Sequence, residues 1–158
     1  YYGALGRVSK TFSVGQVAGL SNVVSVSAGR GVSTVVKKDG TVWVWGSNFQ
    51  GQFGNGDRTN APVQGGLSNE VETFPQQVAG IRNAVSVTSG IMGRHTIVLL
   101  KDGTLRGWGN TDWGQLGAGA SATFQLTPVI PKITGVKAVF AVYNNSYAIK
   151  NDNTFWAW

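Results

Sequence analysis

The residues that could carry out chemistry are few and lie far apart in the sequence. The chain contains one histidine, His95, and no cysteine. A zinc site with Cys ligands, a histidine dyad and thiol catalysis are therefore excluded. Glu70 and Glu72 could form a carboxylate pair for acid–base work, but no neighbouring residue would orient them. The sequence predicts a protein that is not an enzyme.

Other candidate groups recur periodically, which favours a structural role for them. Asp39, Asp102 and Asp152 occupy equivalent positions, each in a predicted hairpin turn. The segments GQFGNG and GQLGAG are rich in glycine but lack the Lys-Ser/Thr of a phosphate loop. We therefore expect no catalytic residue, no metal ion, and no nucleotide or other cofactor bound to the chain.

The composition indicates a globular protein of short strands and tight turns. Of the 158 residues 42% are hydrophobic, 23 are glycine and six are tryptophan. The formal net charge of +6 would suit a nucleic-acid partner, but the basic residues are scattered and their longest run is Lys37-Lys38. Nucleic acid is therefore an unlikely partner. No stretch approaches the roughly 18 apolar residues of a membrane span, so no membrane insertion is expected.

An internal repeat organises the chain. Three segments align, and they read VVSVSAG…STVVKKDGTVWVWGSNFQGQFGNG, AVSVTSG…HTIVLLKDGTLRGWGNTDWGQLGAG and AVFAVYNNSYAIKNDNTFWAW. Their final tryptophans, Trp45, Trp108 and Trp158, recur at a period of about fifty residues, which is typical of propeller blades. The organisation predicted is the end of a preceding repeat over 1–22, a repeat over 23–80 with an enlarged loop over 57–74, a second repeat over 81–135 and the start of a third over 136–158.

Each repeat predicts antiparallel strands joined by hairpins. Asp-Gly pairs such as Asp39-Gly40 separate β-branched runs and favour two-residue type I′ turns. The fold class expected is all-β, with β-propeller blades of four-stranded antiparallel sheets and almost no helix. The expected strands are Val23–Ser27, Ser33–Lys37, Thr41–Trp45, Val85–Thr88, Thr96–Lys101, Thr104–Trp108, Ala138–Val142 and Tyr147–Lys150.

The pattern AG…HT…DGT-x-W-x-WG-x-N…GQLG-x-G, followed by VAGLSN or VAGIRN, resembles the regulator of chromosome condensation repeat family. The resemblance covers nearly the whole chain and implies a propeller, typically of seven blades. Val32 and Asn145 depart from the pattern where His95 follows it, and Arg106 replaces the outer tryptophan. Relatives include a nucleotide exchange factor for a small GTPase and bacterial inhibitors of β-lactamase. The amino-acid sequence of the repeats is more similar to bacterial exported members of the family, which favours an extracellular or cell-surface location over the cytoplasm.

Three units are too few to close a propeller, which needs at least about four blades. The sequence therefore predicts an incomplete ring. The chain is either a piece of a longer propeller or a protomer that completes a ring with other copies through exposed strand edges.

The function predicted is that of a non-catalytic scaffold whose loops bind a protein partner. The enlarged loop supplies four candidate contacts and a second loop supplies a tryptophan without a counterpart in the other repeat; these residues are Arg58, Asn60, Glu70, Glu72 and Trp113. The alternative is a structural or adhesive component of a cell-surface or extracellular assembly. An exchange factor or an enzyme inhibitor, as in the relatives, ranks below both.

Overall fold

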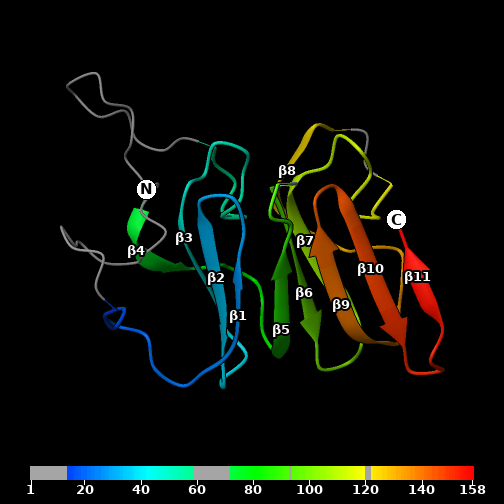
Figure 1. The fold of residues 1–158 in the computed structure, drawn as a ribbon, viewed down its shortest axis with the longest axis horizontal. Helices are drawn as coiled ribbons and strands as arrows, with labels where there is room; N and C mark the ends of the chain where they lie inside the picture. Colours follow the sequence, from blue (N-terminus) through cyan, green and yellow to red (C-terminus); the bar gives the residue numbers. More distant parts are fainter. Residues whose placement is uncertain (1–13, 59–71, 93, 120–121) are drawn as a thin grey trace.

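The computed structural model describes residues 14–58, 72–92, 94–119 and 122–158. They form eleven β-strands in three antiparallel sheets, and none of these described residues lies in a helix. The sheets follow one another along the chain and stand side by side as three blades (Figure 1). The predicted all-β fold of consecutive blades is therefore confirmed.

The strands of each blade pair in chain order. Blade 1 contains β1 (Val23–Ala28), β2 (Val32–Lys37), β3 (Val42–Gly46) and β4 (Glu72–Gln77). Blade 2 contains β5 (Ala84–Ser89), β6 (His95–Leu100), β7 (Leu105–Asn110) and β8 (Phe124–Val129). Blade 3 contains β9 (Val136–Val142), β10 (Asn145–Lys150) and β11 (Phe155–Ala157).

The eight predicted strands all occur, but three others were not predicted. β4 and β8 are the edge strands of their sheets, and each contains a proline, Pro75 or Pro128. Proline interrupts a strand-like sequence pattern and is tolerated at an edge, where its missing N–H is not needed. β11 is a short strand of three residues. The predicted loop over 57–74 is too long, because Glu72 already lies in β4 and pairs with Gly46.

The hairpin turns differ from the predicted type I′. Gly40 has a φ of 79°, but Asp39 is not among the residues with positive φ, whereas a type I′ turn needs positive φ at both positions. Gly40 N donates to Lys37 O and Lys37 N donates to Thr41 O. These bonds define a three-residue hairpin loop in which a type I turn is followed by one left-handed residue. The other two blades repeat it, with Gly103 and Asn153 at the left-handed position.

An aspartate stabilises each of these turns. Asp39 Oδ1 accepts hydrogen bonds from Thr41 Oγ1 at 2.6 Å and from Thr41 N at 3.0 Å. Thr104 and Thr154 donate in the same way to Asp102 and Asp152. The threonine hydroxyl is the main cause that lowers the pKa of each aspartate, because its bond favours the ionised carboxylate.

Acid should therefore destabilise the fold through these three turns. A carboxylate whose folded pKa is lowered contributes stability above its unfolded pKa and loses it as the pH falls through the folded value. We expect the melting temperature to fall as the pH drops below 3.8, the usual aspartate value. A variant with Asp39→Asn, Asp102→Asn and Asp152→Asn should melt lower at neutral pH and lose less on acidification. Parallel pH profiles for the variant and the parent chain would contradict this.

Two apolar cores lie between the blades. The first joins blades 1 and 2 and includes Val36, Val42, Val98 and Trp108. The second joins blades 2 and 3 and includes Ile97 and Leu105, with Val139 and Ala148 from blade 3. Every residue of β6 is buried, because the central blade is covered on both faces.

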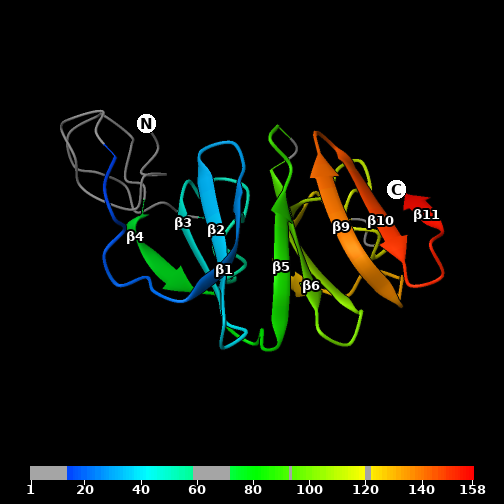
Figure 2. The same cartoon turned by 60° about the horizontal axis from the view of Figure 1, so that its bottom comes forward.

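The first strands of the blades, β1, β5 and β9, stand next to one another (Figure 2). Hydroxyl groups join them across each boundary. Val87 N donates to Ser25 Oγ at 3.2 Å and Ser89 N donates to Ser27 Oγ at 2.9 Å. At the next boundary, Ala141 N donates to Thr88 Oγ1 at 2.9 Å. The small polar residues of these strands thus fix the spacing of the blades.

Candidate functional site

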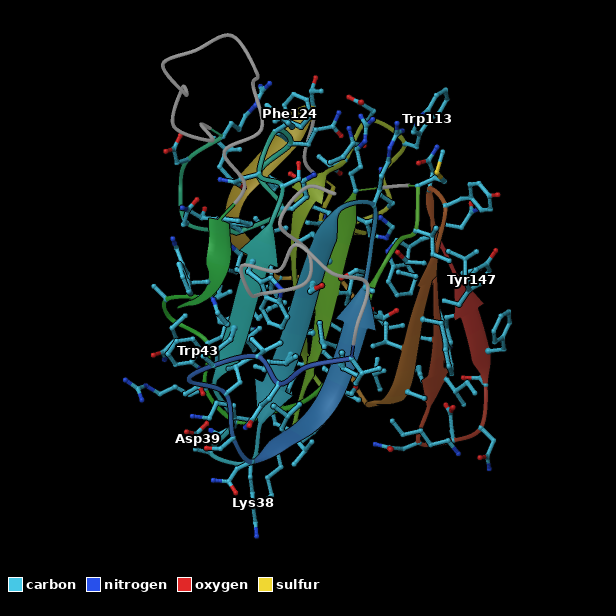
Figure 3. All side chains as sticks on the ribbon, turned by 60° about the vertical axis from the view of Figure 1, so that its left-hand side comes forward. Lys38, Asp39, Trp43, Trp113, Phe124 and Tyr147 are labelled. Carbon is cyan, nitrogen blue, oxygen red and sulfur yellow. The ribbon has the colours of Figure 1, made fainter. Side chains whose placement is uncertain are left out.

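The two ends of the blades carry different connections. Antiparallel strands place alternate connections at opposite ends of a sheet. One end, the loop face, consists of the connections at 29–31, 47–58, 90–92 with Arg94, 111–119 and 143–144. The other end, the turn face, carries the three aspartate turns. Figure 3 shows Trp113 and Phe124 at the first end and Lys38 and Asp39 at the second.

Buried polar side chains hold the long loops of the loop face in place. In blade 1, Asn48 Oδ1 accepts a bond from Phe53 N at 3.0 Å, and Gln52 Oε1 accepts one from Gln50 N at 2.7 Å. In blade 2, Gln115 Nε2 donates to Asn110 Oδ1 at 2.6 Å. Because these side chains occupy the interior of the loops, residues at the loop tips point outward. Trp113, whose N donates to Gln115 Oε1 at 2.9 Å, is such a tip.

Hydrogen bonds between blades fix the loops relative to one another. Trp108 Nε1 of blade 2 donates to Gln52 O of blade 1 at 2.6 Å. Trp158 Nε1 donates in the same manner to Gln115 O at 2.9 Å. His95 Nε2 lies 3.0 Å from Ser146 Oγ in blade 3, and this hydroxyl donates to Gln115 O. His95 therefore makes a side-chain contact across a blade boundary.

The loop face exposes aromatic, apolar and arginine side chains. Trp113 is 74% exposed, and four more large apolar residues are exposed at the same end: Phe49, Ile91, Met92 and Tyr143. The arginines at this end are Arg30, Arg58 and Arg94. Trp, Tyr, Phe, Met and Arg are the residue types that are enriched in protein–protein interfaces. The composition of this face therefore suits protein recognition.

A cavity of about 290 Å³ opens between the loops of blades 1 and 2. Its lining includes Arg30, Ser47, Phe49, Gln50, Gln52 and Arg94. The volume is at the lower end of the range of about 300–1,000 Å³ for small-molecule pockets. A single side chain with its adjoining backbone is therefore a better match in size than a large ligand.

The structure describes part of the predicted binding set. Trp113 is exposed on the loop face as expected. Arg58 is also exposed, with Nε donating to Phe49 O at 3.3 Å and its guanidinium 4.0 Å from the Phe124 ring centroid. Asn60 and Glu70 lie outside the described residues. The backbone of Glu72 lies in the ladder of β4, opposite Gly46.

Sequence reasoning did not identify Arg30 and Arg94. Both occupy turns between a first and a second strand, and they are separated by about sixty residues in sequence. The sequence does contain one signal for Arg94. Alignment of the repeats places it where blade 1 has Gly31, so the second repeat has a long side chain at a turn position that glycine can fill.

The described residues hold no group of three or more His, Cys, Asp or Glu side chains that could bind a metal ion. Within the same part of the chain, no helix is long and apolar enough to cross a membrane.

Comparisons with known proteins agree with this architecture. Two models of the regulator of chromosome condensation (RCC1) repeat match residues 23–52 and 39–99. Protein pim1 of Schizosaccharomyces pombe is 30% identical over 159 residues, which cover 90% of this chain and 28% of pim1. The human E3 ubiquitin-protein ligase HERC2 is 26% identical over 156 residues, which cover 96% of this chain and 3% of HERC2. The chain thus spans a minor part of these relatives.

The crystal structure of Prp20p from Saccharomyces cerevisiae has the same fold, with a TM-score of 0.78 and 23% identity over 99% of this chain and 39% of Prp20p. The relatives named here are eukaryotic and give no support to the expected bacterial type. The chain therefore carries RCC1 repeats, is homologous to the RCC1-like propeller proteins, and forms part of a β-propeller.

Proposed function

We propose that the chain is a non-catalytic protein-interaction module whose loop face binds a protein partner. The observation that carries this proposal is the exposed set of aromatic and arginine side chains on loops that buried Asn, Gln and Trp side chains hold rigid. Rigid presentation lowers the entropy cost of binding, and Trp, Tyr and Arg dominate binding energy at interfaces.

The relatives support the class of function. The structure of Prp20p is described together with its binding to Gsp1p and histones, and another structure shows Kap60 bound to yeast RCC1 (Prp20). These partners belong to Prp20p. Protein binding as a class is what we carry over to this chain, and the exchange-factor, inhibitor and bacterial exported assignments stay predictions.

Self-association is the second candidate. β1 exposes Val24 and Val26, and β11 exposes Phe155 and Trp156, at the two ends of the row of blades. Such surfaces could join copies of the chain into the assembly expected of a structural or adhesive component. Sedimentation of the purified chain separates the alternatives: a scaffold sediments as one discrete species, whereas an assembly component forms larger particles that grow with concentration.

Site-specific photocrosslinking tests the loop face directly. A photoreactive amino acid placed at Trp113, incubated with extract of the cells that make the protein, should give a discrete protein adduct. The matched control places the same group at Asp152, which is exposed on the turn face. Equal adducts from both positions, adducts from Asp152 alone, or adducts that nuclease removes would contradict the proposal.

Shortening the β3–β4 connection should weaken partner binding but leave the fold stable. The change replaces residues 59–71 with a short Gly-Ser link and keeps Glu72, whose backbone pairs with Gly46. Each doubling of loop length costs only about 0.6 kcal/mol, so the melting temperature should hardly change. The control replaces the same residues with an equally long Gly-Ser segment. If the shortened chain unfolds, the segment belongs to the blade; if it binds as well as the parent, recognition lies elsewhere and Trp113 is the next residue to test.

A further inference from the structure

Arg94 occupies a left-handed backbone conformation at a position in the fold where glycine would suffice. Its φ is +53°, in the left-handed region that disfavours a residue with a Cβ. Blade 1 has Gly31 at this place, with a φ of +73°. The two positions are equivalent in hydrogen bonding as well: Arg94 O accepts from Asn110 N, and Gly31 O accepts from Ser47 N. A strained residue at a position where glycine suffices is a reason to look for a function of its side chain.

The side chain lines the cavity between blades 1 and 2, together with another arginine. Arg94 comes from the β5–β6 connection and Arg30 from the β1–β2 connection, and both line the same 290 Å³ space. No ion pair is found for either among the described residues, where the one ion pair joins Lys37 to Asp39 on the turn face. Among the described residues that line the cavity, two carry guanidinium groups and none carries a carboxylate.

A third polar group in the same cavity is a buried acceptor. Gln50 Oε1 is buried and has no hydrogen-bond partner in the described structure. A buried acceptor without a donor costs free energy until a ligand supplies one. The cavity is thus suited to a ligand that places an anion beside the two arginines and can offer an N–H donor to Gln50.

We infer that this cavity binds the carboxylate side chain of an acidic residue in a partner polypeptide. The carboxylate accepts hydrogen bonds from Arg30 and Arg94, whose planar forks match its two oxygens. The Gln50 amide, whose Oε1 is buried before binding, turns toward the ligand and accepts a hydrogen bond from a backbone N–H of the same polypeptide, and Phe49 at the rim packs against the neighbouring apolar atoms. This inference rests on the proposed function, because it names the chemistry of the partner that the loop face receives.

The same groups disfavour the phosphate backbone of a nucleic acid. A phosphodiester has acceptor oxygens but no donor, so it would leave Gln50 Oε1 unpaired. A polypeptide that carries acidic residues supplies both the anion and the N–H donor.

The test measures binding of a fluorescein-labelled hexaglutamate peptide to the whole chain, with labelled hexaglutamine and an oligothymidylate as the other probes. The parent chain should bind hexaglutamate best, with an affinity that falls as salt is added. Arg94→Gly should weaken this binding roughly tenfold, which is the effect of one lost hydrogen bond to a charged group. It should not lower the melting temperature, because glycine relieves the left-handed strain. Arg30→Gln should weaken binding in the same way. Arg82→Gln, which removes one charge on the turn face, is the matched control and should bind like the parent.

Three results of the binding assay would overturn the inference: unchanged binding by Arg94→Gly, equal loss on Arg82→Gln, or tighter binding of the oligothymidylate than of hexaglutamate. The proposed function fails separately. If Arg94→Gly keeps the protein adduct formed from position 113 at full yield, the cavity assignment is wrong and the scaffold stands. If hexaglutamate binds through both arginines but no protein adduct forms at position 113, the cavity assignment stands and the scaffold fails.

Discussion

Replacing Trp108 with alanine should lower the free energy of unfolding by about 4 kcal/mol, within the range for a fully buried tryptophan. The side chain is 0% exposed in the core between blades 1 and 2. Its Nε1 donates to Gln52 O at 2.6 Å, so truncation also leaves a buried carbonyl without its donor. The space left by the missing ring should not be filled easily, because Gly54, which packs against the ring, has no side chain that could move into it. A Cβ on Gly54 would lie 2.9 Å from Trp108 Cγ.

Urea denaturation followed by far-ultraviolet circular dichroism measures this effect, since it does not depend on tryptophan fluorescence. Trp113→Ala is the matched control. That side chain is exposed on the loop face, so its loss should change stability by no more than about 0.5 kcal/mol. Equal destabilisation by the two substitutions would mean that the boundary between blades 1 and 2 does not depend on Trp108.

The repeat predicted most of the fold because its spacing reflects packing. Trp45, Trp108 and Trp158 recur with the period of a blade, and Trp108 and Trp158 make the same bond to the preceding blade. The strands whose sequences are rich in alternating β-branched residues were predicted. β4 and β8 were not predicted, because each contains a proline and lies at the edge of its sheet, where it pairs with a neighbouring strand on one side only.

The turn type and part of the site could not be predicted, for a different reason. Asp-Gly suits both a two-residue and a three-residue hairpin, and the choice depends on the ladder bond between Lys37 and Thr41. Trp113 was identified because it breaks the repeat. The presence of Arg30 and Arg94 in one cavity was missed because they come from turns of different blades, which become neighbours only when the blades pack.

Gly109→Ala should destabilise the fold by about 3 kcal/mol or more, because strain and a steric clash act together. Gly109 has a φ of +98°, which disfavours any residue with a Cβ. The added Cβ would overlap Arg94 O and lie 3.1 Å from His95 Cα. These are backbone atoms, so they cannot move aside as a flexible side chain would. The bond from Asn110 N to Arg94 O, which closes the same turn, would be strained as well.

Gly114→Ala separates the two causes. Gly114 has a φ of +76°, but a Cβ there would meet nothing within 4 Å. It should therefore cost only the left-handed strain, about 1–2 kcal/mol. Equal melting temperatures for the two variants would mean that the close approach of Gly109 to Arg94 O contributes nothing. The clash should also displace the turn that carries the Arg94 side chain. Below its melting temperature, Gly109→Ala should thus bind hexaglutamate more weakly than Gly114→Ala, because the cavity needs both arginines in place.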